Sequence, residues 1–166
     1  MVKWKYLFVA VLILLLGTWG VLRLLPGEEK KIQKQFQWLA EYAAKGEGEA
    51  PFAAAQKIQS LGLLFGETCE FKTPFYSISG DFSREEISLL AGRTRAQFRR
   101  MELHFLDLTV SFPERDMAAA TLTARLTGTL TNGESVNEPH ELQCWLKKID
   151  KHWYFSRLEV VEVLKR

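Results

Sequence analysis

Three polar side chains stand out as pocket candidates: Asp107, the candidate for acid–base chemistry, and His104 and His140, which we expect at the mouth of the pocket. All three fall in segments where apolar and polar residues alternate, which is typical of strands. A carboxylate or imidazole in an apolar pocket has a shifted pKa and can exchange protons near neutral pH. Tyr76 and Trp153 carry polar tips that would complete the lining of such a pocket. We expect these five residues to line a pocket and assign a catalytic role to none of them.

The residue types that bind metals do not occur at the spacing that ligands need. A metal site requires three or four converging ligands, and the sequence contains no HxH, HExxH or CxxC pattern. The two cysteines, Cys69 and Cys144, either pair in an oxidising compartment or stay separate. Cys144 alternates with Leu142 and Leu146, which favours a place in the core. We expect neither a metal ion nor a cofactor.

Four arginines give the densest positive charge in the chain. A helix expected over residues 83–100 has one apolar face, and its other face carries Arg93, Arg95, Arg99 and Arg100. Such a face either binds an anionic ligand, a lipid headgroup or an acidic partner, or is simply solvated. These arginines are the candidate contacts for an anionic partner.

The composition bounds the class of protein. The chain has 166 residues, of which 47% are hydrophobic and 25% charged, with a net charge of +2. This balance excludes a disordered tail, a fibrous repeat and a many-span transporter, and the length suits one domain. Residues 1–25 contain Lys3, Lys5 and Arg23 and no acid, so the rest of the chain is close to neutral. We therefore expect no nucleic-acid partner.

The N-terminal segment predicts a membrane anchor. Residues 6–22 carry no charge, and with Arg23 snorkelling to the headgroups residues 6–25 reach about the 20 residues that span a bilayer. A cleaved signal peptide is the alternative, but Thr18-Trp19-Gly20 is a poor cleavage site. We expect a cytoplasmic tail over residues 1–5, a single span over 6–25 in the cell inner (plasma) membrane, and a domain over 28–166 outside, periplasmic in a Gram-negative cell.

The domain begins with helices. Apolar residues at helical spacing predict one helix over residues 28–45 and a second from Pro51 to about Phe65. Ser83 and Glu86 form a capping box, which predicts the start of the helix over 83–100.

Alternating apolar residues predict extended segments. These cover residues 69–79, 103–112, 118–131, 140–149 and 153–164. The apolar phase shifts by one residue between Phe105 and Leu106, which predicts a β-bulge. Asp107 faces inward if the phase holds and outward if the bulge precedes it. Asn132-Gly133 predicts a hairpin. The element order is therefore α+β, with four long antiparallel strands at the end.

Several segments together resemble the NTF2-like (SnoaL-like) family. They are the helix 83–100, the run 102–112, the threonine-alternating strand and the terminal hairpin 146–159, in which Lys151 and His152 replace the family's Gly-x pair. The resemblance covers about residues 28–166. It implies a cone: a curved antiparallel sheet with helices on its concave side and an apolar pocket, where Leu122, Ala124, Leu126, Leu142 and Leu146 would gather.

The resemblance implies several functions, because this fold hosts many. We expect a membrane-tethered binding or interaction module whose partner is a protein or a small apolar ligand. If the module forms a homodimer, we expect the two copies to meet through the open face of the sheet. The alternatives are a periplasmic isomerase, hydratase or lyase of the ketosteroid-isomerase-like kind, and a subunit of a membrane-bound assembly such as a secretion complex.

Overall fold

The computed structural model describes residues 27–73 and 79–161. The expected tail 1–5, the expected anchor 6–25 and Tyr76 lie outside these residues. Within the described part of the chain, no helix combines the length and the apolarity needed to cross a bilayer.

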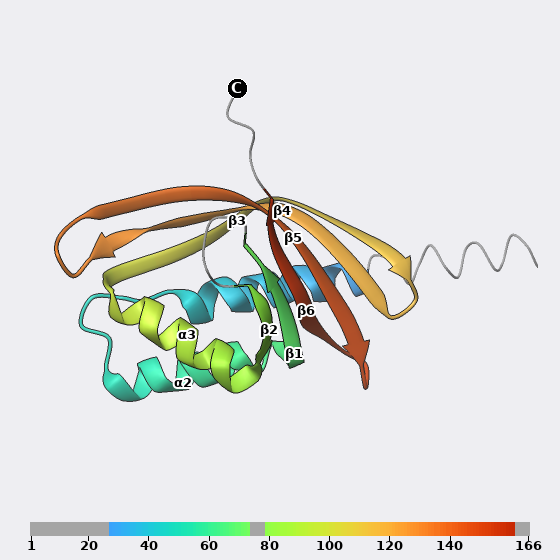
Figure 1. The fold of residues 1–166 in the computed structure, drawn as a ribbon, viewed down its shortest axis with the longest axis horizontal. Helices are drawn as coiled ribbons and strands as arrows, with labels where there is room; N and C mark the ends of the chain where they lie inside the picture. The colour runs from blue at the N-terminus through green and yellow to red at the C-terminus, as the bar shows by residue number, and fades with distance from the viewer. Residues whose placement is uncertain (1–26, 74–78, 162–166) are drawn as a thin grey trace, which may run out of the picture.

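The described chain forms one curved six-stranded sheet with helices packed on its concave side (Figure 1). In chain order the elements are a helix over residues 27–43, α2 (Pro51–Gly62), β1 (Phe65–Lys72), β2 (Gly80–Ser83), α3 (Arg84–Ala96), β3 (Phe98–Glu114), β4 (Met117–Leu130), β5 (Ser135–Ile149) and β6 (His152–Val161). The strand order is β2-β1-β6-β5-β4-β3. This is the cone expected from the sequence.

The sheet departs from the expected antiparallel arrangement at one pair of strands. β3, β4, β5 and β6 follow one another through hairpins and are therefore antiparallel. No hairpin joins β1 to β6, and these two strands run parallel. The expectation of an antiparallel sheet is wrong at this pair.

Helix α3 begins at the predicted capping box. The Ser83 hydroxyl accepts a hydrogen bond from the Glu86 N–H at 3.3 Å, and the Ser83 N–H donates to the Glu86 carboxylate at 2.8 Å. The helix ends at Ala96, well before the expected residue 100. The backbone of Met101 exchanges two hydrogen bonds with that of Lys45, so the segment from residue 98 is drawn into β3.

We expect Ser83→Ala to lower the free energy of unfolding by about 1 kcal/mol. The substitution removes the acceptor for a backbone N–H that has no partner inside the helix. Chemical denaturation of the variant and the wild type measures the change. Thr94→Ala, on an exposed position of the same helix, is the control and should differ little from wild type. Equal midpoints for Ser83→Ala and wild type would contradict the role of the cap.

Helix α2 ends at Gly62, before the expected Phe65. A Cβ on Gly62 would lie 2.2 Å from the Ser88 hydroxyl oxygen, so the glycine permits a close approach of α2 to α3. The next residues form a tight turn in which the Leu64 N–H donates to the Leu61 carbonyl. This turn brings Phe65 into β1, where it is buried.

The predicted bulge in β3 is present. Pairing with β4 shifts register between Leu106 and Thr109, and Asp107 has a φ of 55°. Apolar side chains on both sides of the bulge therefore reach the core. Leu106 itself points outward and is 41% exposed, because the shift falls after it rather than before it. Asp107 is also exposed, so it faces away from the core.

Both predicted hairpins are present. In the first, the Leu130 N–H donates to the Glu134 carbonyl, and Gly133 takes a φ of 91° in the three-residue loop. β5 then starts at Ser135, earlier than the expected residue 140. In the second, Asp150 and Lys151 form a two-residue loop with φ values of 48° and 68°. Positive φ at both positions is characteristic of a type I′ turn, which usually contains glycine. Here two residues other than glycine form it.

Candidate functional site

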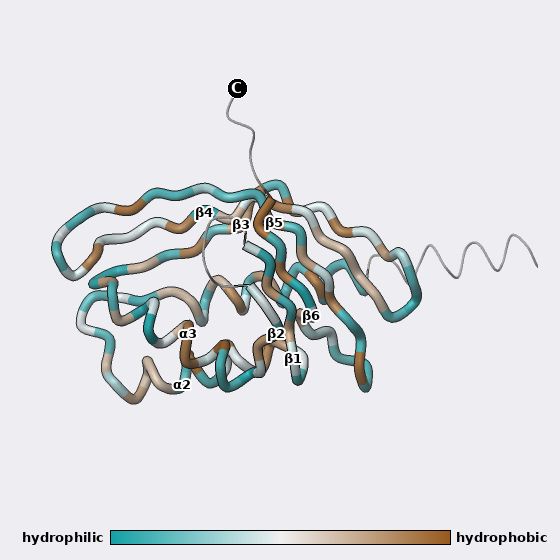
Figure 2. Tube along the Cα trace, viewed as in Figure 1, coloured by the Kyte–Doolittle hydropathy of each residue, from teal (hydrophilic) through white to brown (hydrophobic). Residues whose placement is uncertain are grey.

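The concave side of the sheet is filled by the helix over residues 27–43. Ile32 and Phe36 from this helix are fully buried with Leu146 and Phe155 from the sheet. The Phe36 ring lies edge-on to Phe155 with centroids 5.1 Å apart, and to Phe105 with centroids 5.3 Å apart. Figure 2 shows apolar positions spread along the strands and helices that meet here. Of the five apolar side chains expected around a pocket, Leu122 and Leu146 are buried in this core, and Leu126 and Leu142 pack against it partly buried.

The two candidate histidines lie on opposite faces of the sheet. His140 pairs with Ala124, which pairs with Phe105, and all three point to the concave side. His104 pairs with Arg125 and points to the convex side. Each histidine lies near a glutamate of its own strand, with His104 Nε2 3.3 Å from Glu102 and His140 Nε2 3.6 Å from Glu138. The expectation that they share a pocket mouth is therefore wrong.

Trp153 is a core residue with a defined polar contact. It is buried, and its indole N–H donates to the Glu28 carboxylate at 2.8 Å. The ammonium groups of Lys31 and Lys148 lie 2.7 Å and 2.9 Å from the same carboxylate. Burial alone raises the pKa of Glu28, but these three donors outweigh it and lower the pKa to about 2. This cluster ties the helix 27–43 to β5 and β6, so Trp153 does not line an open pocket.

Arg95 is a buried structural residue and not part of a solvated arginine face. Only 3% of it is exposed, and its Nη1 donates to the carbonyls of Tyr42, Ala43 and Ala44 at 2.8, 2.7 and 2.5 Å. The carbonyls of Tyr42 and Ala43 belong to the last turn of the helix 27–43 and that of Ala44 follows it directly, so none of them accepts a hydrogen bond inside the helix. Arg95 also forms an ion pair with Glu49.

The other three arginines lie apart. Arg99 and Arg100 are in β3, where Arg99 donates to the Thr131 carbonyl at 3.0 Å and Arg100 pairs with Glu102 at 2.5 Å. Arg93 stays on the exposed side of α3. The predicted cluster of four therefore does not exist, because the helix that would carry it ends at Ala96.

The two cysteines are free and buried. Burial raises the pKa of the Cys69 thiol to about 12, and burial with the neighbouring Cys69 raises that of Cys144. Both thiols are thus protonated and unreactive at neutral pH. Within the described residues, no group of three His, Cys, Asp or Glu side chains is placed to hold a metal ion.

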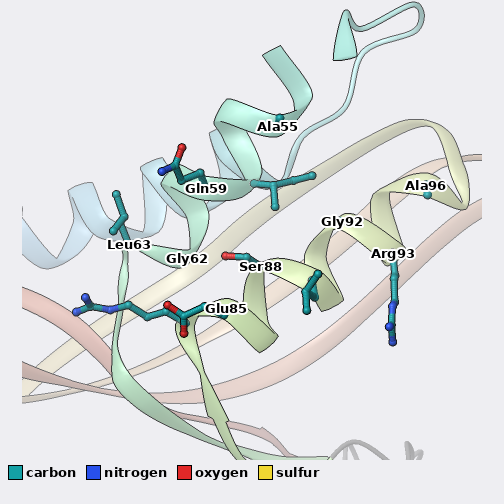
Figure 3. Close-up of a pocket in the computed structure, with 12 residues that line it drawn as sticks. Ala55, Gln59, Gly62, Leu63, Glu85, Ser88, Gly92, Arg93 and Ala96 are labelled. Atoms are coloured by element: carbon teal, nitrogen blue, oxygen red, sulfur yellow. The ribbon is translucent and has the colours of Figure 1, made fainter. Parts of the chain in front are cut away.

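A large hollow lies outside the cone, between α2 and α3. This α2–α3 groove has a volume of about 910 Å³ and is lined mostly by small and apolar residues of both helices, together with the charged Arg84, Glu85 and Arg93 (Figure 3). Gly62 lets the helices approach closely, and Gly92 faces Ile58, to which a Cβ would make an ordinary contact at 3.4 Å.

Three large apolar side chains stand exposed at or beside this groove. Phe52 is 82% exposed, Leu89 61% and Leu63 59%. Leu63 and Leu89 line the groove, and Phe52 lies at the start of α2. Sequence analysis missed this surface by following only the inward face of α2. The sequence feature that could have revealed this surface is a second stripe at helical spacing along α2, formed by Phe52, Ala55, Gln59 and Leu63.

Comparisons with known proteins show the fold. No family model matches the chain, and no curated protein matches it. A putative scytalone dehydratase from Novosphingobium aromaticivorans is 16% identical, covering 82% of this chain and 85% of its own, with a TM-score of 0.67. Hexachlorocyclohexane dehydrochlorinase LinA-type3 from Novosphingobium barchaimii is 13% identical, covering 81% and 86%, with a TM-score of 0.65.

A third solved structure is named as an association domain and not as an enzyme. A putative calcium/calmodulin-dependent protein kinase II association domain from Xanthomonas campestris is 13% identical, covering 81% of this chain and 84% of its own, with a TM-score of 0.59. At these identities the likeness extends to the fold alone, a curved sheet with helices on its concave side, which fits the cone that the resemblance to NTF2-like domains implies.

Proposed function

We propose that this chain is an NTF2-like interaction domain that docks a partner through the α2–α3 groove. The observation that carries the proposal is the position of the open apolar space, which lies between α2 and α3. The concave side holds a packed core, whereas an apolar groove of about 910 Å³ is open between α2 and α3. Exposed apolar patches of this kind mark sites of interaction. The association domain among the solved structures supports the proposal by its name.

Binding of the apolar dye anilinonaphthalene sulfonate to the dilute full chain in non-fluorescent detergent tests this proposal. Leu89→Asp places a charge in the groove and should abolish most of the dye fluorescence that the domain contributes. Leu106→Asp is the matched control, since Leu106 is exposed on the sheet and should leave dye binding unchanged. Equal dye binding by wild type and Leu89→Asp would contradict the proposal.

A lyase is the second candidate, and the names of two solved structures favour it over a binding module. One is called a dehydratase and the other a dehydrochlorinase, and both names denote elimination reactions. An enzyme of this kind needs a base beside its substrate. Of the described acid–base candidates, His140 is the one on the concave side, where it is half-buried. Loss of a measured elimination activity in His140→Ala, with the fold intact, would overturn the interaction domain.

We further propose that residues 6–25 anchor the domain in the inner membrane, with the domain outside. The uncharged run over residues 6–22 supports this. We expect the mature protein to retain its N-terminus and to stay in the membrane fraction after washing with alkaline carbonate. Release into the supernatant, or a mature N-terminus near Val21, would contradict the anchor. A tethered interaction domain would also suit a subunit of a membrane-bound assembly.

A further inference from the structure

We propose that the partner in the α2–α3 groove is a second copy of this chain. The two copies would be related by a two-fold axis that brings their α3 helices together antiparallel, centred on Leu89. This inference rests on the proposed function, because it names the partner of the same surface.

The first argument is the order of charges along the exposed side of α3. Glu85, Leu89 and Arg93 follow one another at intervals of four residues, so they lie on one stripe of the helix. The acid and the base are equally far from Leu89, at about 6 Å of helix rise on either side. An antiparallel copy therefore places Glu85 opposite Arg93 of the other copy, and places the two leucines against each other.

The second argument is that these two charges are free to take a partner. Within the described part of the chain, neither Glu85 nor Arg93 has a hydrogen bond or ion pair from its side chain. The other charged side chains of α3 are all engaged. Arg84 donates to the Phe65 carbonyl at 2.8 Å, Glu86 closes the capping box and Arg95 is buried. Glu85 and Arg93 are therefore the two charged side chains of α3 that remain to form ion pairs with an antiparallel second copy.

The third argument is the position of the exposed apolar side chains of α2. The close approaches of Gly62 to Ser88 and of Gly92 to Ile58 show that α2 runs antiparallel to α3. A two-fold axis across α3 therefore also stacks α2 on α2 of the other copy in reverse direction. The same contacts set Leu61 of α2 level with Leu89, so the C-terminal ends of the two α2 helices, with the exposed Leu63, meet across the axis, whereas Phe52 lies beyond the contact. The same surface serves both copies, so the assembly closes as a dimer.

The convex face of the sheet, where the sequence predicted a homodimer, is less suited to this contact. Three of its charged side chains pair among themselves, since Glu102 lies 2.5 Å from Arg100 and 3.3 Å from His104. Leu106 is the large apolar side chain of β3 that is exposed there. The α2–α3 groove combines more exposed apolar surface with unpaired charges, so we place the dimer contact on it.

A charge swap tests the arrangement. Sedimentation equilibrium of the full chain in density-matched detergent should show a dimer for the wild type. Glu85→Arg sets two arginines against each other at both ends of the contact, and Arg93→Glu does the same with two acids. Each single variant should raise the dissociation constant of the dimer about tenfold or more. The double variant Glu85→Arg/Arg93→Glu restores opposite charges and should dimerise like the wild type.

The outcomes separate this inference from the proposed function. A monomeric wild type, unchanged single variants or a double variant that fails to recover would each overturn the antiparallel dimer. If the wild type is monomeric while Leu89→Asp still abolishes dye binding, the groove takes a different partner and the proposed function stands. If dye binding is unaffected by Leu89→Asp, the proposed function itself is wrong.

Discussion

Arg95→Met should lower the free energy of unfolding by about 3–5 kcal/mol, because it removes one partner of a buried ionic network. The guanidinium holds three backbone carbonyls at the end of the helix 27–43 and also the Glu49 carboxylate. Methionine fills a similar volume but donates no hydrogen bond. The carbonyls and the Glu49 carboxylate would stay buried with fewer partners, and Lys57, 2.8 Å from Glu49, would not replace the lost donors.

Arg93→Met is the matched control, on the same helix and two residues away. Arg93 is exposed and has no partner within the described residues, so its loss should change the stability by less than about 0.5 kcal/mol. Urea denaturation of the dilute proteins, followed by circular dichroism, measures both. Equal stability of Arg95→Met and the wild type would show that Arg95 does not hold the helix 27–43 in place.

Phe36→Ala should cost about 3–5 kcal/mol and should open the cone. The Phe36 ring is fully buried between Phe105 and Phe155, so its removal leaves a cavity that the surrounding sheet cannot fill. Apolar cavities of this kind stay dry and bind small apolar molecules. We therefore expect benzene to raise the melting temperature of Phe36→Ala and to leave that of the wild type unchanged.

Phe52→Ala is the matched control for this second prediction, as the same substitution at an exposed position. At a protein concentration low enough to keep the chain monomeric, it should lie within about 0.5 kcal/mol of wild type. A stable Phe36→Ala variant, or a wild type stabilised by benzene as much as the variant, would mean that the cone is not filled as described.

The parts of the fold that depend on local contacts could be predicted from the sequence. Ser83 and Glu86 satisfy each other's backbone groups within one turn, so the start of α3 can be read from four residues. Asn132-Gly133 predicts its hairpin for the same reason. The bulge in β3 was visible as a shift of the apolar phase, although the shift falls one position later than expected.

The parts that depend on distant contacts could not be predicted in this way. The local sequence pattern predicts that the helix continues past Ala96. Pairing of Met101 with Lys45 and of β3 with β4 makes that segment a strand instead. Arg95 reads as a surface residue because its acceptors, Glu49 and the carbonyls of residues 42–44, lie far earlier in the chain. The filling of the cone by Phe36 likewise depends on how the helix 27–43 docks.

The candidate site in the structure differs from the one predicted from the sequence for the same physical reason. Alternation places His104 and His140 on strands, but which face each one takes depends on register between strands, and the register sets them on opposite faces. The α2–α3 groove arises from two helices brought together at Gly62 and Gly92. Neither helix shows from its own sequence that the other lies beside it.

Hydroxyl-radical footprinting of the full chain at low and high protein concentration tests the central claim most directly, because it measures the exposure of individual side chains. Docking of a second copy through the α2–α3 groove predicts that oxidation of Leu63 and Leu89 falls as concentration rises. Leu106 and Ile149, which are 41% and 50% exposed elsewhere on the sheet, should be oxidised equally at both concentrations. Protection of Leu106 with no change at Leu63 and Leu89 would contradict the claim.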